Sequence, residues 1–458
     1  MQVSNQAAGD SGGMPHWSSR FAFIMAAVGS AVGLGNIWKF PYMAGTGGGG
    51  AFVLMYLGIV LLFGVPILIA ELMLGRMAQR APAAALAHLG RTHGGTTAWG
   101  WIGGMGVIAA LLILSFYSVV AGWAVAYIPE MLSGELANAN AERTAEVFGA
   151  LLANPEQLLV WHSIFMVATV AIVAGGVTKG IEAFVTWMMP ALFIMLLFLV
   201  GYAMVEGEFL RGVAYLFRPD FSAITVDVVI AAAGQAFFSL SIGLGTMLAY
   251  GSYLPRDVSI PKTAVTVALA DTSVALLAGC AIFPIVFASG LNPGEGPGLV
   301  FVTLTVAFGS MPFGMIVGAV FFLLLAVAAI TSSISLLEPI VATLKERSGL
   351  SRPLLCVLIG LVAWVMGLAT VWSFNDWSDV KVLGDRTPFD TIDYVTSSIM
   401  LPLGGALMAV FTGWVLSSET LRRELGFDSE ALFGFWRFLI RFVAPVGVAA
   451  VAIQKILG

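Results

Sequence analysis

Long apolar stretches separated by short polar segments follow one another along almost the whole chain. A helix needs about 20 apolar residues to cross the hydrocarbon core of a bilayer, and eleven stretches come close to that length or exceed it. They lie at about 18–45, 51–79, 101–128, 158–176, 180–204, 222–251, 260–289, 311–345, 352–371, 390–418 and 433–456. This pattern predicts an all-α polytopic membrane protein with eleven transmembrane helices.

Glycines interrupt two of these stretches. Residues 28–41 read VGSAVGLGNIWKFP, and residues 237–246 read FFSLSIGLGT. Each glycine weakens a helix by about 1 kcal/mol relative to alanine, and an unpaired amide or carbonyl in hydrocarbon costs several kcal/mol more. A break at such a place is tolerable only if something polar fills it. We therefore expect two broken membrane helices whose freed backbone groups bind an ion and a small polar solute.

The two breaks fall in the first and the sixth stretch, at corresponding places in successive five-span units. An odd number of spans per unit inverts the second unit, and paired breaks of this kind indicate a transporter with its site near the bilayer midplane. We expect one transporter domain over residues 16–456, with inverted repeats at 18–204 and 222–418 and an eleventh span at 433–456. Residues 1–15 are expected to form a disordered cytoplasmic N-terminus.

Composition narrows the class of protein further. Hydrophobic residues make up 59% of the 458 residues and charged residues only 10%, with a mean hydropathy of +0.95, whereas soluble domains carry about 25% charged residues. The net charge of −5 gives no sign of nucleic-acid binding. Cys280 and Cys356 both lie in apolar stretches, so no disulfide framework is indicated. We find no nucleophile–base or metal cluster that would predict an enzyme, and no continuous polar file that would predict a channel.

Lysine and arginine gather in alternate loops, which predicts the orientation. When the N-terminus is placed in the cytoplasm, the inside loops carry most of these residues and the C-terminus lies outside. The loop at 129–157 is then outside, and its charges are mostly acidic.

Several motifs resemble the neurotransmitter:sodium symporter family over residues 16–456. They are GSAVGLGNIWKFP at 29–41, GGGAF at 48–52, QAFFSLS at 235–241 and TSS at 331–333, with Trp17, Arg20, Glu71, Gly75 and Arg76. Eleven spans are similar to the bacterial branch that includes multi-hydrophobic amino-acid transporters. The resemblance implies a 5+5 inverted-repeat, leucine-transporter-like fold in a bacterial cytoplasmic membrane. It also implies sodium-coupled symport by alternating access.

The resemblance implies one sodium site between spans one and eight. Its ligands would be backbone carbonyls and two hydroxyls, contributed by Gly29, Val32, Ala328, Thr331 and Ser332. Sodium is a hard cation that prefers several oxygen ligands, which an unwound backbone and hydroxyls supply without net charge. The alternative for Thr331–Ser333 is ordinary hydrogen bonding between membrane helices.

A second sodium site next to the substrate is also implied, at Ala31, Asn36, Ser239 and Asp271. Many relatives carry a neutral asparagine at the position of Asp271 and bind chloride nearby. The chloride-site positions match here at Tyr56, Gln235 and Ser239, but Ala275 lacks the fourth polar group. An intramembrane carboxylate is costly unless paired. We therefore predict chloride independence, with Asp271 supplying the negative charge; alternatively Asp271 carries a proton or is structural.

The substrate would lie between the breaks. Amides near Leu34 and Gly35 at a half-helix N-terminus suit a carboxylate, and the Tyr117 hydroxyl would assist. Carbonyls near Ala31, Phe238 and Ser241 suit an ammonium group. Amine-transporting relatives carry an aspartate where this chain has Gly33, so the glycine favours an amino acid.

The side-chain pocket would be apolar and uncharged, which favours hydrophobic L-amino acids. Its expected residues are Ile113, Tyr117, Phe238, Leu244, Ser332 and Leu336. For Phe238 and Tyr117 the alternative is plain core packing. Another small zwitterion, either a small neutral amino acid or a taurine-like solute, is the rival substrate class, and a non-transporting substrate sensor is the rival function. Proton counter-transport and the oligomeric state stay open.

Gates are implied at both ends of the pathway. Lys39 and Asp393 would form a water-bridged outer gate with Phe238 as the lid beneath it, and lysine lacks the bidentate fork of arginine. Trp17 and Glu346 match the inner-gate positions. Met14 stands about where relatives carry a basic residue, and Arg20 is the alternative basic partner.

Overall fold

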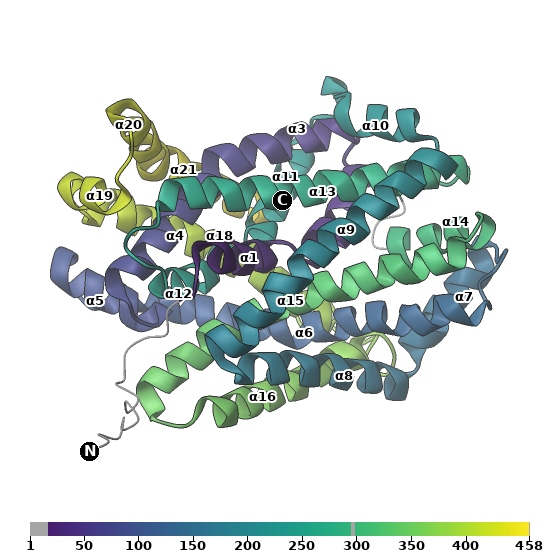
Figure 1. Ribbon diagram of the computed structural model, residues 1–458, viewed down its shortest axis with the longest axis horizontal. Helices are drawn as coiled ribbons and strands as arrows, with labels where there is room; N and C mark the ends of the chain where they lie inside the picture. The colour runs from purple at the N-terminus through teal and green to yellow at the C-terminus, as the bar shows by residue number, and fades with distance from the viewer. Residues whose placement is uncertain (1–16, 295–297, 458) are drawn as a thin grey trace, which may run out of the picture.

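The computed structural model describes residues 17–294 and 298–457. The segment expected to be disordered, residues 1–15, and Met14 within it, lie outside the described residues. Within the described ranges the protein is built from helices and contains no strand beyond isolated bridges. Figure 1 shows the helices as one layered bundle, with α1 (Arg20–Ala31) near its middle.

The first half of the chain forms the helices expected for spans one to five. They are α1, a π-helical turn Gly35–Lys39 with α2 (Phe40–Thr46), α3 (Gly50–Ile59) and α4 (Val65–Ala78) joined by the turn Val60–Gly64, α5 (Pro82–Gly94), α6 (Gly100–Ser133), α7 (Ala141–Ala153), α8 (Pro155–Ala174), and the turn Val177–Glu182 with α9 (Ala183–Glu206).

The second half follows a similar pattern. It comprises α10 (Phe209–Phe217), a short turn Phe221–Ala223, α11 (Val226–Ser239), α12 (Thr246–Ser252), α13 (Ile260–Ala288), the turn Leu299–Thr303 with α14 (Leu304–Ser310), α15 (Gly314–Ser348), α16 (Arg352–Ser373), α17 (Pro388–Asp393), the turn Tyr394–Met400, α18 (Leu401–Val410), the turn Phe411–Val415, α19 (Ser418–Leu425), α20 (Glu430–Phe438), the turn Leu439–Val443 and α21 (Ala444–Leu457).

Nine helices in the described ranges are long and apolar enough to span a bilayer. A tenth appears when α1 and the segment Gly35–Thr46 count as one span bent by 48°. The sixth predicted span is divided into α11 and α12, and neither is long enough to count alone. The two expected breaks are therefore present, while eleven spans as a number stays a prediction.

The core sits where α6 and α15 pack along each other, and these are the longest of the described helices, at 34 and 35 residues. α1 packs against α9, α13 and α15, so its broken end lies inside the bundle. Figure 1 shows α8 and α16 beyond α6 on one side and α3, α11 and α13 on the other. A break at the end of α1 is thus enclosed by protein rather than by lipid, as such a backbone requires.

Buried side chains form hydrogen bonds with the backbone N–H and carbonyl groups that are left unpaired at the two breaks. The Gly33 N–H donates to Asn36 Oδ1 at 3.0 Å, and Gln235 Nε2 donates to the Gly35 carbonyl at 2.6 Å. In the second break the Gly243 N–H donates to a Glu71 carboxylate oxygen at 2.8 Å. Gly243 has φ +84°, which favours glycine at that position. The polar residues at the breaks therefore stabilise the unwound backbone directly.

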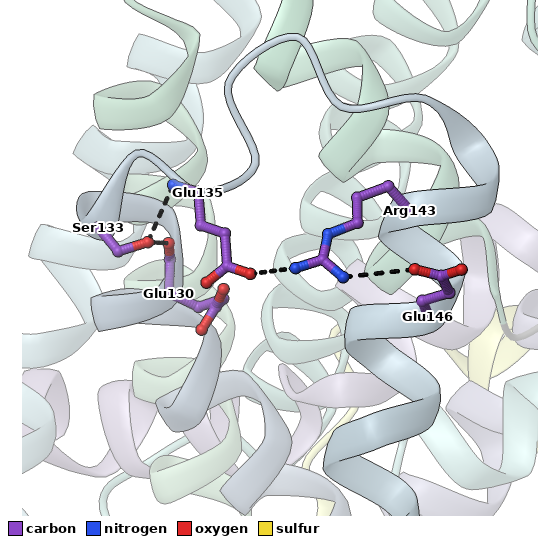
Figure 2. A network of polar contacts seen from close by, with 5 residues as sticks. All are labelled: Glu130, Ser133, Glu135, Arg143 and Glu146. Atoms are coloured by element: carbon purple, nitrogen blue, oxygen red, sulfur yellow. Dashed lines mark hydrogen bonds and ion pairs between the residues drawn. The ribbon is translucent and has the colours of Figure 1, made fainter.

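The acidic loop after α6 is held by one arginine (Figure 2). Arg143 in α7 forms an ion pair with Glu135 and a second one, at 3.3 Å, with Glu146. The Ser133 hydroxyl donates to the Glu130 carbonyl at 2.7 Å and accepts from the Glu135 N–H at 3.1 Å. The charged side chains are half exposed, and such ion pairs contribute little to stability.

A candidate binding site between the helix breaks

The structure brings the expected residues of the span-one/span-eight ion site together. The Thr331 hydroxyl lies 2.9 Å from the Ala328 carbonyl and 3.4 Å from the Val32 carbonyl, and the Ser332 hydroxyl lies 3.2 Å from the Val32 carbonyl. A Cβ added to Gly29 would lie 3.1 Å from Met189 Sδ and 3.4 Å from the Thr331 Cβ, so Gly29 packs beside Thr331. Several buried oxygens thus converge without a charged group, which is the donor set that a sodium ion prefers.

Asn36, Ser239 and Asp271 also meet, as expected for the second ion site. Asn36 Nδ2 donates to Asp271 Oδ1 at 2.7 Å and to the Ser239 hydroxyl at 3.0 Å. The Ser239 hydroxyl lies 2.8 Å from Asp271 Oδ2, and Ala31 lines the same cavity as Ser239. All three side chains are buried, and no lysine or arginine forms an ion pair with Asp271 in the described residues. Neutral donors alone surround this carboxylate, so a bound cation would stabilise it.

Asp271 accepts hydrogen bonds from two of the residues that match the family's chloride-site positions. The Tyr56 hydroxyl donates to Asp271 Oδ2 at 3.2 Å, so Tyr56 and Ser239 both contact this carboxylate. Gln235 donates instead to the Gly35 carbonyl, and Ala275 is buried and apolar. Chloride independence stays a prediction. Its basis is that the Asp271 carboxylate already accepts hydrogen bonds from Tyr56 and Ser239, two of the side chains that would otherwise bind chloride.

A cavity between the breaks carries nearly every residue expected at the substrate site. It encloses about 30 Å³, room for little more than a water molecule, so an amino acid enters only if the pocket opens. The expected residues that line it are Ala31, Gly33, Gly35, Ile113, Tyr117, Phe238, Ser241, Leu244, Ser332 and Leu336. Leu34 does not line the cavity, but its N–H donates to the Tyr117 hydroxyl at 3.3 Å. The backbone amide and the tyrosine expected at a carboxylate are therefore adjacent.

Three polar residues of this cavity escaped the sequence analysis. Ser30, Thr246 and Ser335 line it together with the expected residues. Ser30 directly precedes Ala31, Thr246 directly follows the second glycine break, and Ser335 lies one helical turn after Ser332. Ser30 and Thr246 could have been predicted because they lie next to residues that were already expected at the site. Ser335 could have been predicted because it lies three residues after Ser332 and therefore on the same face of the helix.

A larger cavity of about 430 Å³ lies on the other side of Phe238 and Tyr117, which line both cavities. Lys39 and Asp393, the expected outer gate, both line it. The Lys39 ammonium lies 4.5 Å from the centre of the Phe238 ring, and Asp393 accepts a bond of 2.9 Å from Ser397. No ion pair within 4 Å joins Lys39 to Asp393 among the described residues. Phe238 therefore separates the two cavities, as a lid would.

The two expected inner-gate residues, Trp17 and Glu346, each contact other residues. Trp17 Nε1 donates to the Tyr250 carbonyl at 3.2 Å, and its ring meets that of Tyr250 edge-on at 5.3 Å. Glu346 forms an ion pair of 3.6 Å with Arg80 and accepts from the Ala81 N–H at 3.0 Å. The basic partner of Glu346 is thus Arg80 and not Arg20, because the loop after α4 reaches the end of α15. Sequence reasoning missed Arg80, whose partner lies far away in the chain.

Comparison with known proteins gives matches over almost the full length. The profile of the Sodium:neurotransmitter symporter family matches residues 14–147 and 150–458. An uncharacterized sodium-dependent transporter of Bacillus subtilis, YhdH, is 38% identical over 443 residues, which are 96% of this chain and 97% of that protein. A sodium-dependent transporter of Haemophilus influenzae is 32% identical over 448 residues, with 96% and 98% covered. The crystal structure of MhsT in complex with L-phenylalanine is similar with a TM-score of 0.90 and 42% identity, covering 97% of this chain and 100% of that one.

Proposed function

Because the chain belongs to the sodium:neurotransmitter symporter family, we propose that it imports hydrophobic L-amino acids, each together with two sodium ions. The family consists of transporters rather than enzymes, so the chain is a sodium-dependent symporter and a multi-pass membrane protein with the leucine-transporter-like fold. The substrate, the number of ions and the direction of transport are the proposal. The observation that carries it is the cavity between the two helix breaks, whose lining contains no charged side chain.

The chemistry of this cavity favours a zwitterion with an apolar side chain. The Leu34 N–H and the Tyr117 hydroxyl lie together where a carboxylate would bind, and freed carbonyls at the breaks suit an ammonium group. A Cβ added to Gly33 would lie only 3.0 Å from the Tyr117 hydroxyl. An aspartate of the amine-transporter type would therefore be crowded there. MhsT, 42% identical, has been crystallised with L-phenylalanine, which supports a hydrophobic substrate here as well.

Two sodium ions supply enough free energy to accumulate the substrate against a steep concentration gradient. One charge that crosses about 100 mV releases about 2.3 kcal/mol, and a tenfold gradient adds about 1.4 kcal/mol per ion. Two ions thus supply roughly 7 kcal/mol, enough for roughly 10⁵-fold accumulation of a zwitterion. One ion would support only a few hundred-fold. In this proposal Asp271 supplies the fixed negative charge at the second site, so transport does not require chloride.

Transport would proceed by alternating access. Sodium and the amino acid enter from the outside through the larger cavity, and Phe238 closes behind them. Spans one, two, six and seven then rock against the rest, and the inner side opens where Trp17 packs on Tyr250. The N-terminus lies in the cytoplasm and the C-terminus outside, in a bacterial cytoplasmic membrane. The domain limits and inverted repeats given above belong to the same proposal.

Uptake into proteoliposomes tests the function. Each of the twenty amino acids and taurine is offered with inward gradients of sodium or potassium, in chloride and in gluconate. We expect saturable uptake of leucine-like and aromatic amino acids that requires sodium and persists in gluconate. Uptake confined to taurine or to small neutral amino acids would refute the substrate class. Sodium-dependent binding in a scintillation-proximity assay without any uptake would identify a sensor instead.

A further inference from the structure

Three arginines line a cavity of about 680 Å³ at the place where α19 packs against α4. Arg76 lies in the last turn of α4, Arg256 in the loop between α12 and α13, and Arg423 in the last turn of α19. Asp257 and Glu424 also line this space, so positive groups outnumber negative groups by three to two. In the proposed orientation these segments face the cytoplasm. We call this space the arginine cavity; its other lining residues are Val258, Ser259, Leu425 and Gly426.

Arg76 connects the three segments that form the arginine cavity. Its side chain is buried, and its guanidinium donates to the Val258 carbonyl at 2.7 Å and to the Glu424 carbonyl. The guanidinium also lies 4.0 Å from the Glu424 carboxylate. Arg76 and Glu424 therefore compensate each other's charge, and the remaining positive charge of the cavity belongs to Arg256 and Arg423.

Arg256 and Arg423 have no acidic partner. Both side chains are exposed, and neither forms an ion pair with a carboxylate among the described residues. Asp257, which lines the same cavity, is likewise without an ion pair in those ranges. A guanidinium offers five N–H donors in a planar fork that fits the oxygens of a phosphate group. Two such groups at one cavity suit an anion with several oxygens.

The start of α13 adds positive potential at the same place. This helix of 29 residues begins directly after Ser259, which lines the arginine cavity, and the Ser259 side chain does not cap it. The N–H groups in the first turn of a helix lack partners within the helix, and this end carries a partial positive charge that favours anions. An uncapped helix start and three arginines thus meet at one cavity.

We propose that the arginine cavity binds a phosphate group and that the bound group holds the cytoplasmic side of the protein closed. The phosphate belongs either to the head group of an anionic lipid in the cytoplasmic leaflet or to a soluble phosphate. Basic pockets between membrane helices on this side of the membrane are suited to anionic head groups. Both sources share the chemistry that Arg256 and Arg423 recognise.

The closing role rests on the proposed function. α4 belongs to span two, and the loop that carries Arg256 joins spans six and seven, all of which rock during transport in that proposal. α19, which carries Arg423, joins spans ten and eleven, which do not. A phosphate between Arg256 and Arg423 therefore favours the conformation in which the two groups of spans lie together on the cytoplasmic side.

Binding is tested on the purified full-length protein in detergent. One arm measures the affinity for radiolabelled orthophosphate, and the other measures the shift in thermal unfolding when phosphatidylglycerol or phosphatidylcholine is added. Arg256→Gln and Arg423→Gln should each weaken binding about tenfold, because each removes a charge-assisted hydrogen bond. Arg422→Gln is the matched control, since Arg422 lies in the same helix but pairs with Glu430 and does not line the cavity. Its affinity should equal that of the wild type.

The two arms distinguish the sources of the phosphate group. Binding of orthophosphate identifies a soluble ligand, whereas stabilisation by phosphatidylglycerol alone, without a response to phosphatidylcholine or orthophosphate, identifies a lipid head group. Either result supports the site if both cavity variants lose it. The site is refuted if neither probe binds, if Arg256→Gln and Arg423→Gln both bind as tightly as the wild type, or if Arg422→Gln loses as much affinity as they do.

Sodium-dependent leucine uptake into proteoliposomes tests the closing role. The probe that binds is supplied as orthophosphate inside the vesicles or as phosphatidylglycerol added to a phosphatidylcholine bilayer. It should slow uptake by the wild type about fivefold or more and leave uptake by Arg256→Gln and Arg423→Gln unchanged. Unaltered uptake by the wild type despite binding would refute the closing role. Absence of leucine uptake under every condition would refute the proposed function and the closing role together, while the binding arms still decide the site.

Discussion

The side-chain amide of Asn36 donates a hydrogen bond of 2.7 Å to the carboxylate of Asp271. This bond joins the first helix break to α13 across 235 residues of sequence. Asn36 also accepts a hydrogen bond from the Gly33 N–H. One side chain therefore binds both the unwound backbone and the intramembrane carboxylate and fixes their relative position. A change at either residue should therefore affect ion binding before it affects the rest of the fold.

Asp271→Ala should abolish sodium-dependent uptake, because it removes the only charge at the second ion site and leaves Asn36 and Tyr56 without their shared acceptor. Asp271→Asn keeps the shape but not the charge, and should restore uptake only when chloride is present to supply an anion. The measurement is amino-acid uptake at varied sodium concentration in chloride and gluconate media. Sodium-dependent uptake that survives in Asp271→Ala would remove this residue from the site.

Thr331→Val and Ser332→Ala should each raise the sodium concentration needed for half-maximal uptake by about fivefold or more, since each removes one oxygen ligand worth about 1 kcal/mol. Ser333→Ala provides the matched control on the same helix. Its hydroxyl bonds to the Ile330 carbonyl and to Thr169, away from the Val32 carbonyl. An equal shift in all three variants would show a general loss of helix packing rather than an ion site.

Glu71→Gln should keep most of the uptake, whereas Glu71→Ala should lose it. The glutamine carbonyl can accept the Gly243 N–H that Glu71 accepts now at 2.8 Å, while alanine leaves this buried donor unpaired at a cost of about 1–3 kcal/mol. Thermal unfolding in detergent and uptake in proteoliposomes measure the two effects. A glutamine variant as inactive as the alanine variant would mean that the charge of Glu71 is needed, and not only its oxygen.

Lys39→Met should speed the release of bound substrate to the outside by about two- to fivefold, because the ammonium over the Phe238 ring contributes about 0.5–1 kcal/mol to the closed lid. Lys39→Arg should slow release, since a guanidinium stacks on the ring and can also engage Asp393 bidentately. The dissociation rate of labelled substrate is the measurement. Lys381→Met changes an exposed lysine in the loop between α16 and α17 and should leave that rate unchanged.

Arg143→Ala should change uptake by less than about twofold. The arginine holds the loop after α6 through Glu135 and Glu146 (Figure 2), but all three side chains are half exposed, and exposed ion pairs are weak. Increased proteolytic nicking of the loop at 134–140, compared with wild type under the same conditions, should report the loosened segment. A large loss of uptake would show that this loop takes part in transport.

Much of the candidate site could be predicted from local sequence. The glycines of 28–41 predicted a break, and the structure has one there, with Asn36 Oδ1 accepting the Gly33 N–H and Gln235 donating to the Gly35 carbonyl. Thr331 and Ser332 were assigned through the family resemblance, because a hydroxyl on a helix can also bond to a carbonyl of its own helix, as Thr331 does to Ala328. The family motifs added Asn36, Ser239 and Asp271, which no spacing along the chain would have connected.

Other parts were beyond such reasoning. Arg80 replaces Arg20 as the partner of Glu346, and Ser30, Thr246 and Ser335 share one cavity although they come from three helices. Single residues of these types occur on many helix faces, and their sequence neighbours do not say which helix packs opposite. The number of spans illustrates the same limit, because the divided sixth stretch falls below the length of a continuous span.

The sequence by itself determined that this chain crosses a membrane many times, where its helices break, and that polar groups must fill the breaks. These properties follow from local hydrophobicity and from the backbone chemistry of glycine. Only the tertiary structure decided which polar groups meet: Asn36 with Asp271, Glu71 with Gly243, Glu346 with Arg80, and Ser30 with no partner at all among the described residues. The physical reason is that hydrogen bonds and ion pairs act over a few ångströms in space, and helix packing alone brings residues so far apart in the chain within that range.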